Sequence, residues 1–149
     1  MAARERTLTT AIQTVLNAAT FTPAISVEVS FLPVYDHEED YGTTQVNVSP
    51  ASRTQTPSTR TSAGFGRKTI DIVLVITRKA AIDSEAWIES IDVAEDIEDA
   101  IRSYNGKFGG CSWMSSETNP LYDIDLAQNS GVFQQVQVHT FEVTETKRA

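Results

Sequence analysis

Apolar and polar residues alternate in two early segments of the chain and run together in a third. Residues 25–31 alternate strictly, which predicts a strand with one buried side and one solvent-facing side. A second alternating segment, residues 46–49, predicts another strand, which Pro50 is expected to end. Residues 69–77 are apolar at consecutive positions and rich in β-branched side chains, so we expect them to form the central strand of a sheet.

A three- and four-residue spacing of apolar side chains predicts a short helix near the start of the chain. Thr7 is its expected N-cap, and the helix should end before Pro23, because the residue that precedes a proline avoids the helical region. The apolar stripe of this helix consists of Leu8, Ala11, Ile12, Val15, Leu16 and Ala19.

A longer helix is predicted between residues 84 and 104. It should be capped by Asp83 or Ser84 and should stop at Asn105 and Gly106. Its expected buried stripe consists of Trp87, Ile88, Ile91, Ala94, Ile97, Ile101 and Tyr104. Its expected solvent-facing side consists of Glu85, Glu89, Asp92, Glu95, Asp96 and Asp99.

The closing segment, residues 131–144, predicts a last strand, but its apolar residues change sides along its length. Val136 and Val138 fall on one side, and Phe133, Phe141 and Val143 on the other. That change predicts a bulge or a strand covered on both sides. Residues 107–119 indicate at most a short strand near 112–115, and no element is predicted for residues 121–126.

A long polar segment separates the second and third predicted strands. Residues 51–68 consist mainly of Ser, Thr, Pro, Gly and Arg. Loops of this length are uncommon in compact domains and are usually functional or disordered. We therefore expect residues 49–67 to form an extended loop or arm of one domain that spans residues 1–149. The basic residues here can contact phosphates or an acidic helix of a neighbouring subunit, and the candidate interface consists of Arg53, Arg60, Arg67 and Lys68.

Composition narrows the classes of protein that the chain can belong to. Its 149 residues are 40% hydrophobic, which suits a single folded core. A formal net charge of -8 opposes bulk attraction to nucleic acid or to an anionic membrane. The one cysteine excludes a disulfide within the chain. The polar start is unlike a secretory signal, and the longest apolar run, residues 72–76, is too short to span a membrane, so we expect a soluble protein.

The residues that could carry chemistry do not form a recognisable motif. The acidic segment 36–40 lacks the spacing of a calcium loop and is expected to be a solvated turn. His37 and His139 are far apart, and with one cysteine they supply too few ligands for zinc. Cys111 has no basic neighbour that would activate it, so a small buried thiol is expected. Residues 64–66 do not make a phosphate loop. We therefore expect no catalytic residue, no metal and no cofactor.

Carboxylates crowd the second predicted helix without the basic partners that usually lie four residues away, and only Arg102 is near. Such self-repulsion costs stability. An acidic helix face is usually only solvated, and the alternatives are that this face meets a basic partner or lines a passage for an anionic polymer. The carboxylates expected to face such a channel come from this helix and from the acidic segment 36–40. They are Asp36, Glu38, Glu39, Asp40, Glu89, Asp92 and Asp96.

The order of these segments resembles a known family of proteins. A short helix and an alternating strand precede Thr-Gln-Val-Asn-Val-Ser-Pro at residues 44–50 and then the polar arm. Arg-Lys-Thr-Ile-Asp-Ile-Val-Leu-Val follows at residues 67–75, then one helix. Gly-Val-Phe-Gln-Gln-Val-Gln-Val-His-Thr-Phe-Glu-Val at residues 131–143 closes the chain. Over nearly its whole length this order resembles the tail terminator or tail completion proteins of long-tailed bacteriophages.

The resemblance implies an α+β fold, with a mixed, largely antiparallel sheet packed against one long central helix and a short N-terminal helix. It implies a homohexameric ring at the head-proximal end of the tail tube, which stops tube growth and joins the tail to the head connector. The implied partners are the major tail tube protein and a head–tail connector or head-closure protein. DNA would only pass through the channel, no membrane would be contacted, and the protein, made in the host cytoplasm, would reside in the virion. The resemblance implies no catalytic residue.

Two alternatives stay open. Residues 107–124 fit the family pattern least well, which leaves a head–tail adaptor or a head-closure neck protein as a second virion role. A small cytosolic ligand-binding domain or enzyme is the alternative from a different class. A well-formed, dry pocket with converging polar groups would favour that class.

Overall fold

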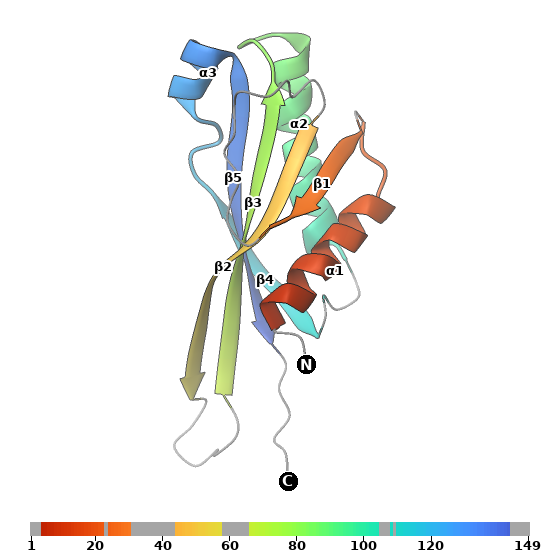
Figure 1. The fold of residues 1–149 in the computed structure, drawn as a ribbon, viewed down its shortest axis with the longest axis vertical. Helices are drawn as coiled ribbons and strands as arrows, with labels where there is room; N and C mark the ends of the chain where they lie inside the picture. The colour runs from red at the N-terminus through yellow and green to blue at the C-terminus, as the bar shows by residue number, and fades with distance from the viewer. Residues whose placement is uncertain are drawn as a thin grey trace.

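The computed structural model describes residues 4–22, 24–30, 44–57, 66–104, 108 and 110–143. In this part of the chain, five strands form one sheet in the order β1-β2-β3-β5-β4 (Figure 1). The β1–β2 pair is parallel and the other pairs are antiparallel, so the predicted α+β class with a mixed, largely antiparallel sheet is confirmed. The elements are α1 (Arg4–Ala18), β1 (Ile25–Val29), β2 (Thr44–Pro57), β3 (Gly66–Lys79), α2 (Glu85–Arg102), β4 (Cys111–Thr118), α3 (Ile124–Ser130) and β5 (Val132–Val143).

One face of the sheet carries the main core. Alternate residues of β3 point to this face, and Ile70, Ile72 and Leu74 are fully buried there. The helices α1 and α2 contact each other and contribute their apolar stripes to the same cluster. On the opposite face Val73 and Val75 of β3 are buried as well. The central position of β3, predicted from its unbroken apolar run, is therefore confirmed.

The first helix begins earlier than predicted. It starts at Arg4, so Thr7 lies inside the first turns and is not the N-cap. The hydroxyl of Thr9 donates to the carbonyl of Arg6 at 3.0 Å, a bond within the helix. Every fourth residue of the predicted stripe, Leu8, Ile12 and Leu16, is buried. With 15 residues against 18 in α2, this helix is not much shorter than the central one.

The second helix begins as predicted, with Ser84 as the N-cap that accepts a hydrogen bond from the amide of Trp87. It ends at Arg102, and the predicted stop at Asn105 and Gly106 lies outside the described residues. The predicted stripe was wrong at Ile88 and Tyr104, which are 55% and 44% exposed. The buried residues are Trp87, Ser90, Val93, Ala94, Ile97 and Ile101.

Trp87 explains this rotation of the buried stripe. Its ring makes edge contacts with two other aromatic rings. The ring centroids lie 5.2 Å apart for Phe133 and 5.0 Å apart for Tyr122. A side chain fixed there turns the neighbouring Ile88 by about 100° around the helix, out to solvent. The helix therefore buries the small Ser90 one turn further on, and not a second large aliphatic residue.

The C-terminal third contains two elements that the sequence indicated weakly or not at all. The strand near residues 112–115 is confirmed and is longer, as β4. Helix α3 was not predicted, although Asp123 caps it by accepting from the amide of Leu126 at 3.0 Å. Gly131 ends it in the left-handed conformation at φ 63°. This pair of an Asp cap and a terminating Gly was the signal that could have located the helix.

Of the two alternatives predicted for the last strand, the bulge is absent from β5, whereas the burial of four consecutive residues, 132–135, shows cover on both sides. This strand pairs with β3 in an unbroken register from Val132 to Val143. The irregularity lies instead in its other neighbour, β4, between Trp113 and Ser115. The apolar residues of β5 change sides because polar residues occupy core-facing positions in the middle of the strand.

Candidate assembly surfaces

A two-stranded arm projects from one end of the sheet (Figure 1). The sequence predicted an extended loop or arm across residues 49–67 and a strand that ends at Pro50. The described residues of the arm form strands and not a loop, and the strand does not end at Pro50. Strand β2 continues through Pro50 to Pro57 and pairs with β3 as far as Gly66. A register shift between Pro50 and Ser52 lets the chain pass the proline, a position where the missing amide is tolerated.

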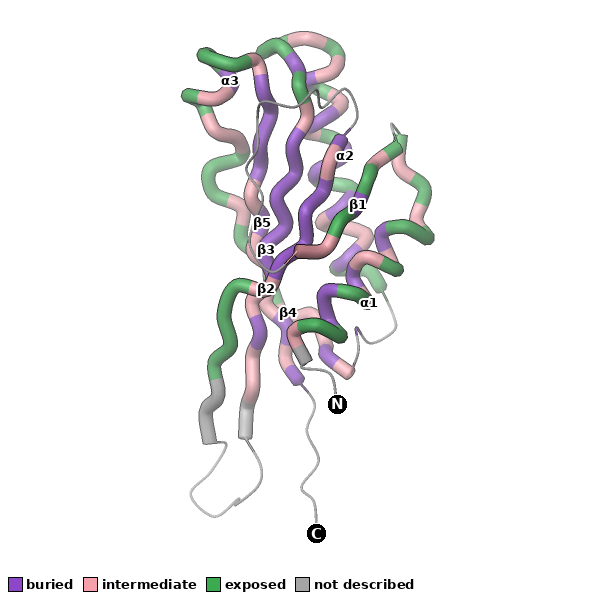
Figure 2. Tube along the Cα trace, viewed as in Figure 1, coloured by how far each residue is buried: buried purple, intermediate pink, exposed green. Residues whose placement is uncertain are grey.

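The outer edge of β2 has a neighbour for only part of its length. Strand β1 pairs with it as far as Val48, where the amide of Ser30 also donates to the Val48 carbonyl at 3.0 Å. From Pro50 onward, no strand of the described chain lies on that side. Residues 51–54 are exposed there (Figure 2). Backbone groups along such an edge can pair with another chain.

The base of the arm is tied to the rest of the sheet. The carboxylate of Asp71 accepts from the hydroxyl of Ser52 at 2.9 Å and from the hydroxyl of Thr140 at 2.7 Å. Arg53 forms an ion pair with Glu5 of α1 at 3.2 Å. These contacts orient the arm as it leaves the sheet.

Three of the four predicted interface residues belong to the strands of this arm. Arg53 is exposed on β2. Lys68 is half-buried on β3, where it lies opposite Gln55 of β2. Arg67 is the residue before it, opposite Thr56 in the β2–β3 register. Arg60 lies outside the described residues.

The solvent-facing side of α2 is acidic, as predicted. Glu85, Asp92, Glu95 and Asp96 are exposed. One further carboxylate of this predicted side has a basic partner from outside the helix, which the prediction about spacing along the helix did not cover. Glu89 forms an ion pair at 3.1 Å with Arg78.

Arg78 reaches Glu89 from strand β3, so no spacing along the helix could have revealed the pair. Arg102 pairs with Asp99 at 2.6 Å. Of the predicted channel-facing residues, Asp92 and Asp96 are exposed without a described partner, and the acidic residues of segment 36–40 lie outside the described chain. Those acidic residues are Asp36, Glu38, Glu39 and Asp40.

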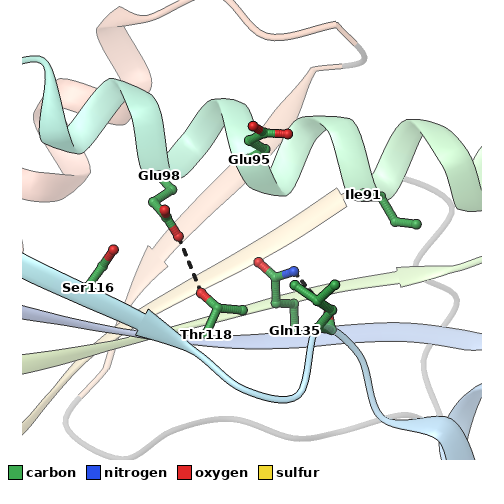
Figure 3. Close-up of a pocket in the computed structure, with 7 residues that line it drawn as sticks. Ile91, Glu95, Glu98, Ser116, Thr118 and Gln135 are labelled. Atoms are coloured by element: carbon green, nitrogen blue, oxygen red, sulfur yellow. Dashed lines mark hydrogen bonds between the residues drawn. The ribbon is translucent and has the colours of Figure 1, made fainter.

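An open groove of about 410 Å³ lies between α2 and β4 (Figure 3). Glu98 of α2 accepts from the hydroxyl of Thr118 at 3.3 Å across it. The side-chain amide of Gln135 donates to the carbonyl of Leu121 at 2.9 Å at its end. Residues of α2, β4, β5 and the segment before α3 line it, namely Ile91, Glu95, Glu98, Ser116, Thr118, Leu121 and Gln135.

A row of polar side chains is buried beneath α2 along the core-facing side of β5. The indole N–H of Trp113 lies 3.1 Å from Nδ1 of His139, and Nε2 of His139 lies 2.9 Å from Oε1 of Gln137. The amide of Gln137 donates to Gln135 at 2.7 Å and to the carbonyl of Ala94 at 2.9 Å. Every member of the row therefore has a partner, as buried polar groups require.

Two of the residues considered for chemistry, His139 and Cys111, are buried in the protein interior. Burial lowers the pKa of His139 from 6.5 to about 4, so this imidazole is neutral near pH 7. Cys111 is fully buried, which confirms the predicted buried thiol. Within the described ranges, no three His, Cys, Asp or Glu side chains lie close enough together to hold a metal ion. None of the described helices is long and apolar enough to cross a membrane.

Comparisons with known proteins give matches among solved structures. No family model matches the sequence, and no curated protein matches it. Among solved structures, a chain described as "Virion of native gene transfer agent (GTA) particle" aligns over 95% of this chain and 97% of its own length. The two chains are 14% identical, and the TM-score is 0.49. At this score the likeness does not establish a common fold, and no function follows from it.

Proposed function

We propose that the chain is a structural virion protein that forms a ring at the head-proximal end of a phage tail tube. There it ends tube polymerisation and joins the tail to the head connector. The ring contains about six copies, in keeping with the family that the sequence resembles. Its neighbours are the major tail tube protein on one side and a connector or head-closure protein on the other.

The unpaired edge of the β2–β3 arm carries this proposal. A two-stranded ribbon is marginally stable in water by itself, and an exposed edge strand invites pairing with another chain. From Pro50 to Pro57 this edge is free of any neighbour in the described structure. Residues 51–54 on it are polar or small, which suits contacts between proteins better than a hydrophobic core. An element of this kind is expected in a subunit that adds to a growing assembly.

The arrangement of elements also supports the proposal. The family resemblance implies a helix, a strand, a strand with an arm, a central strand, a helix and a closing strand, and this order is present. Head-to-tail contacts between identical subunits close into a ring when the rotation between copies permits. The exposed carboxylates Asp92 and Asp96 are our candidates for a surface that lets DNA slide past without binding.

Deleting the gene from the phage that encodes the chain tests the proposal. We expect filled heads without tails, together with tail tubes that exceed their normal length, because nothing ends tube growth. Electron microscopy of lysates distinguishes the alternatives. Tails of normal length that lack only a head would favour the adaptor or head-closure role. Undiminished infectious particles would contradict every virion role and return the ligand-binding or enzyme class to consideration.

A further inference from the structure

The groove between α2 and β4 combines apolar and acidic side chains in a way that fits a protein segment. Leu121 is 61% exposed at one end, and Ile91 lines the helix side. Glu95 is exposed and has no described partner, and Glu98 has a single neutral hydrogen bond, from Thr118. The exposed apolar surface favours a partner that can cover it, and the two carboxylates favour a partner with positive charge.

The arm has the complementary character. Its described strand residues, 50–57 and 66–71, contain three basic residues and one acidic residue. The acidic one, Asp71, is engaged by Ser52 and Thr140 at the base. Arg53 is 47% exposed, and its ion pair with Glu5 is partly open to water. Exposed pairs of this kind contribute little to stability, so Arg53 can exchange Glu5 for another carboxylate at little cost.

The topology of the sheet separates the arm from the groove within one copy. The arm grows from β2 and β3, and Arg53 contacts α1, which packs over β1 and β2. The groove lies beside β4, which is the opposite edge strand in the order β1-β2-β3-β5-β4. A contact between two different surfaces of a subunit can join copies head to tail, and repeating it generates a ring or a filament.

We propose that the arm of one copy docks into the α2–β4 groove of the next copy. The basic side chains of the arm, Arg53 first among them, face Glu95 and Glu98. Apolar and backbone atoms of the arm cover Leu121 and Ile91. The contact rests on the proposed ring and identifies the surface through which its subunits join.

Site-directed crosslinking of the full-length chain tests the contact directly. In the variant carrying Thr54→Cys and Ser116→Cys, one cysteine lies on the arm and the other lines the groove. The native Cys111 is fully buried and should not react. Oxidation of the associated protein should give a ladder of covalent oligomers. The matched control, Thr54→Cys with Asn129→Cys on exposed α3, should give none.

Charge reversal separates electrostatic pairing from damage to the fold. R53E and E95K should each raise the concentration for half-association by about tenfold, since like charges then face each other. The combined R53E/E95K variant should return to within about threefold of the unmodified chain, which a merely misfolded variant would not do. E85K, at an exposed position on the same helix outside the groove lining, is the control and should change association by less than about threefold. Sedimentation at several concentrations and at two salt concentrations gives these values.

The results of these experiments test the arm–groove contact separately from the proposed function. A ring that forms without the Thr54–Ser116 crosslink, or an arm cysteine that crosslinks only elsewhere, would overturn the groove as the docking surface and leave the ring in place. Failure of R53E/E95K to recover would overturn the proposed pairing as well. A chain that never self-associates would overturn the contact, whereas the gene-deletion phenotype decides the virion role independently.

Discussion

At the scale of single residues, a continuous chain of hydrogen bonds holds the buried row from Trp113 to Gln135. The tautomer of His139 follows from its partners: the indole N–H of Trp113 donates to Nδ1, so the proton sits on Nε2 and is donated to Gln137. The same Gln137 holds the carbonyl of Ala94 in α2. One strand residue therefore links the imidazole to the helix.

His139 predicts a loss of stability on acidification. Its folded pKa of about 4 lies below the ordinary value of 6.5, so the unfolded chain takes up a proton first as the pH falls. The contribution of neutral His139 to the free energy of unfolding is fully present above pH 6.5. It is lost progressively between pH 6.5 and pH 4 and changes no further below pH 4. The loss amounts to about 3 kcal/mol at most. Urea unfolding at pH 7 and pH 4.5 should show it, and the pH dependence should be smaller in H139Q by a comparable amount. Equal pH dependence in both proteins would contradict it.

Gln137 predicts a second effect in the same row. Gln137→Leu keeps roughly the same volume but leaves the His139 N–H, the Gln135 oxygen and the Ala94 carbonyl without their partner. Unsatisfied buried groups cost about 1–3 kcal/mol each, so we expect a loss of at least about 2 kcal/mol in the free energy of unfolding. Thr118→Val, which removes only the half-buried bond to Glu98, should lose less than about 1 kcal/mol in the same denaturation experiment. Losses of equal size would show that the row contributes no more than a surface bond.

At the scale of elements, the arm is an extension of the two strands that also build the core. Asp71 and Thr140 fix its base, and Ile70, fully buried, marks where the core begins. The arm beyond Thr54 and Thr69 pairs with little except itself and the end of β5. The element thus divides into a part that the fold needs and a part that is free for assembly.

Shortening the arm tests this division. Replacing residues 55–68 by Asn-Gly joins Thr54 to Thr69, which are directly opposite in the register, through a turn that suits a hairpin. We expect the purified protein to keep its circular dichroism spectrum and a melting temperature within a few degrees, and the gene carrying the change to give no head–tail joining. Loss of the folded state would show that the outer arm belongs to the core. A functional virion would show that it has no role in assembly.

At the scale of the whole molecule, the net charge of the protein governs its affinity for DNA. The formal net charge is -8, and much of it faces solvent on α2. A protein that makes few phosphate contacts releases few counterions and gains little affinity. These properties suit a surface past which DNA moves.

Free protein should therefore bind duplex DNA weakly at physiological salt. Fluorescence anisotropy with a labelled 30-base-pair duplex should give no saturation below about 10 μM, because nonspecific binding already needs several phosphate contacts to reach that range. A variant with Asp92→Lys and Asp96→Lys should bind more tightly and with a steeper dependence on salt concentration. Submicromolar binding by the unmodified chain would contradict a passive channel surface.

The sequence by itself determined the parts of this protein that depend on local patterns. The alternation of residues 25–31, the apolar run of residues 69–77 and the Ser84 cap were enough to place β1, β3 and the start of α2. The α+β class followed from the resemblance of their order to a known family. The acidic side of α2 and the basic residues of the arm could also be identified from the sequence, because folding does not change which charged residues a segment contains. In the candidate docking surface, only these charges could be foreseen.

The tertiary structure alone decided where those residues meet. Residues 51–57 form a strand because β3 offers them a hydrogen-bonding partner, although their own composition indicates a loop. Ile88 is exposed and Ser90 buried because Trp87 packs against Phe133, a contact between residues far apart in the chain. Gln137 and His139 are buried because each polar atom finds a partner on β4, β5 or α2. These outcomes depend on contacts between distant segments, whose free energies outweigh local preferences and leave no periodic signal in the sequence.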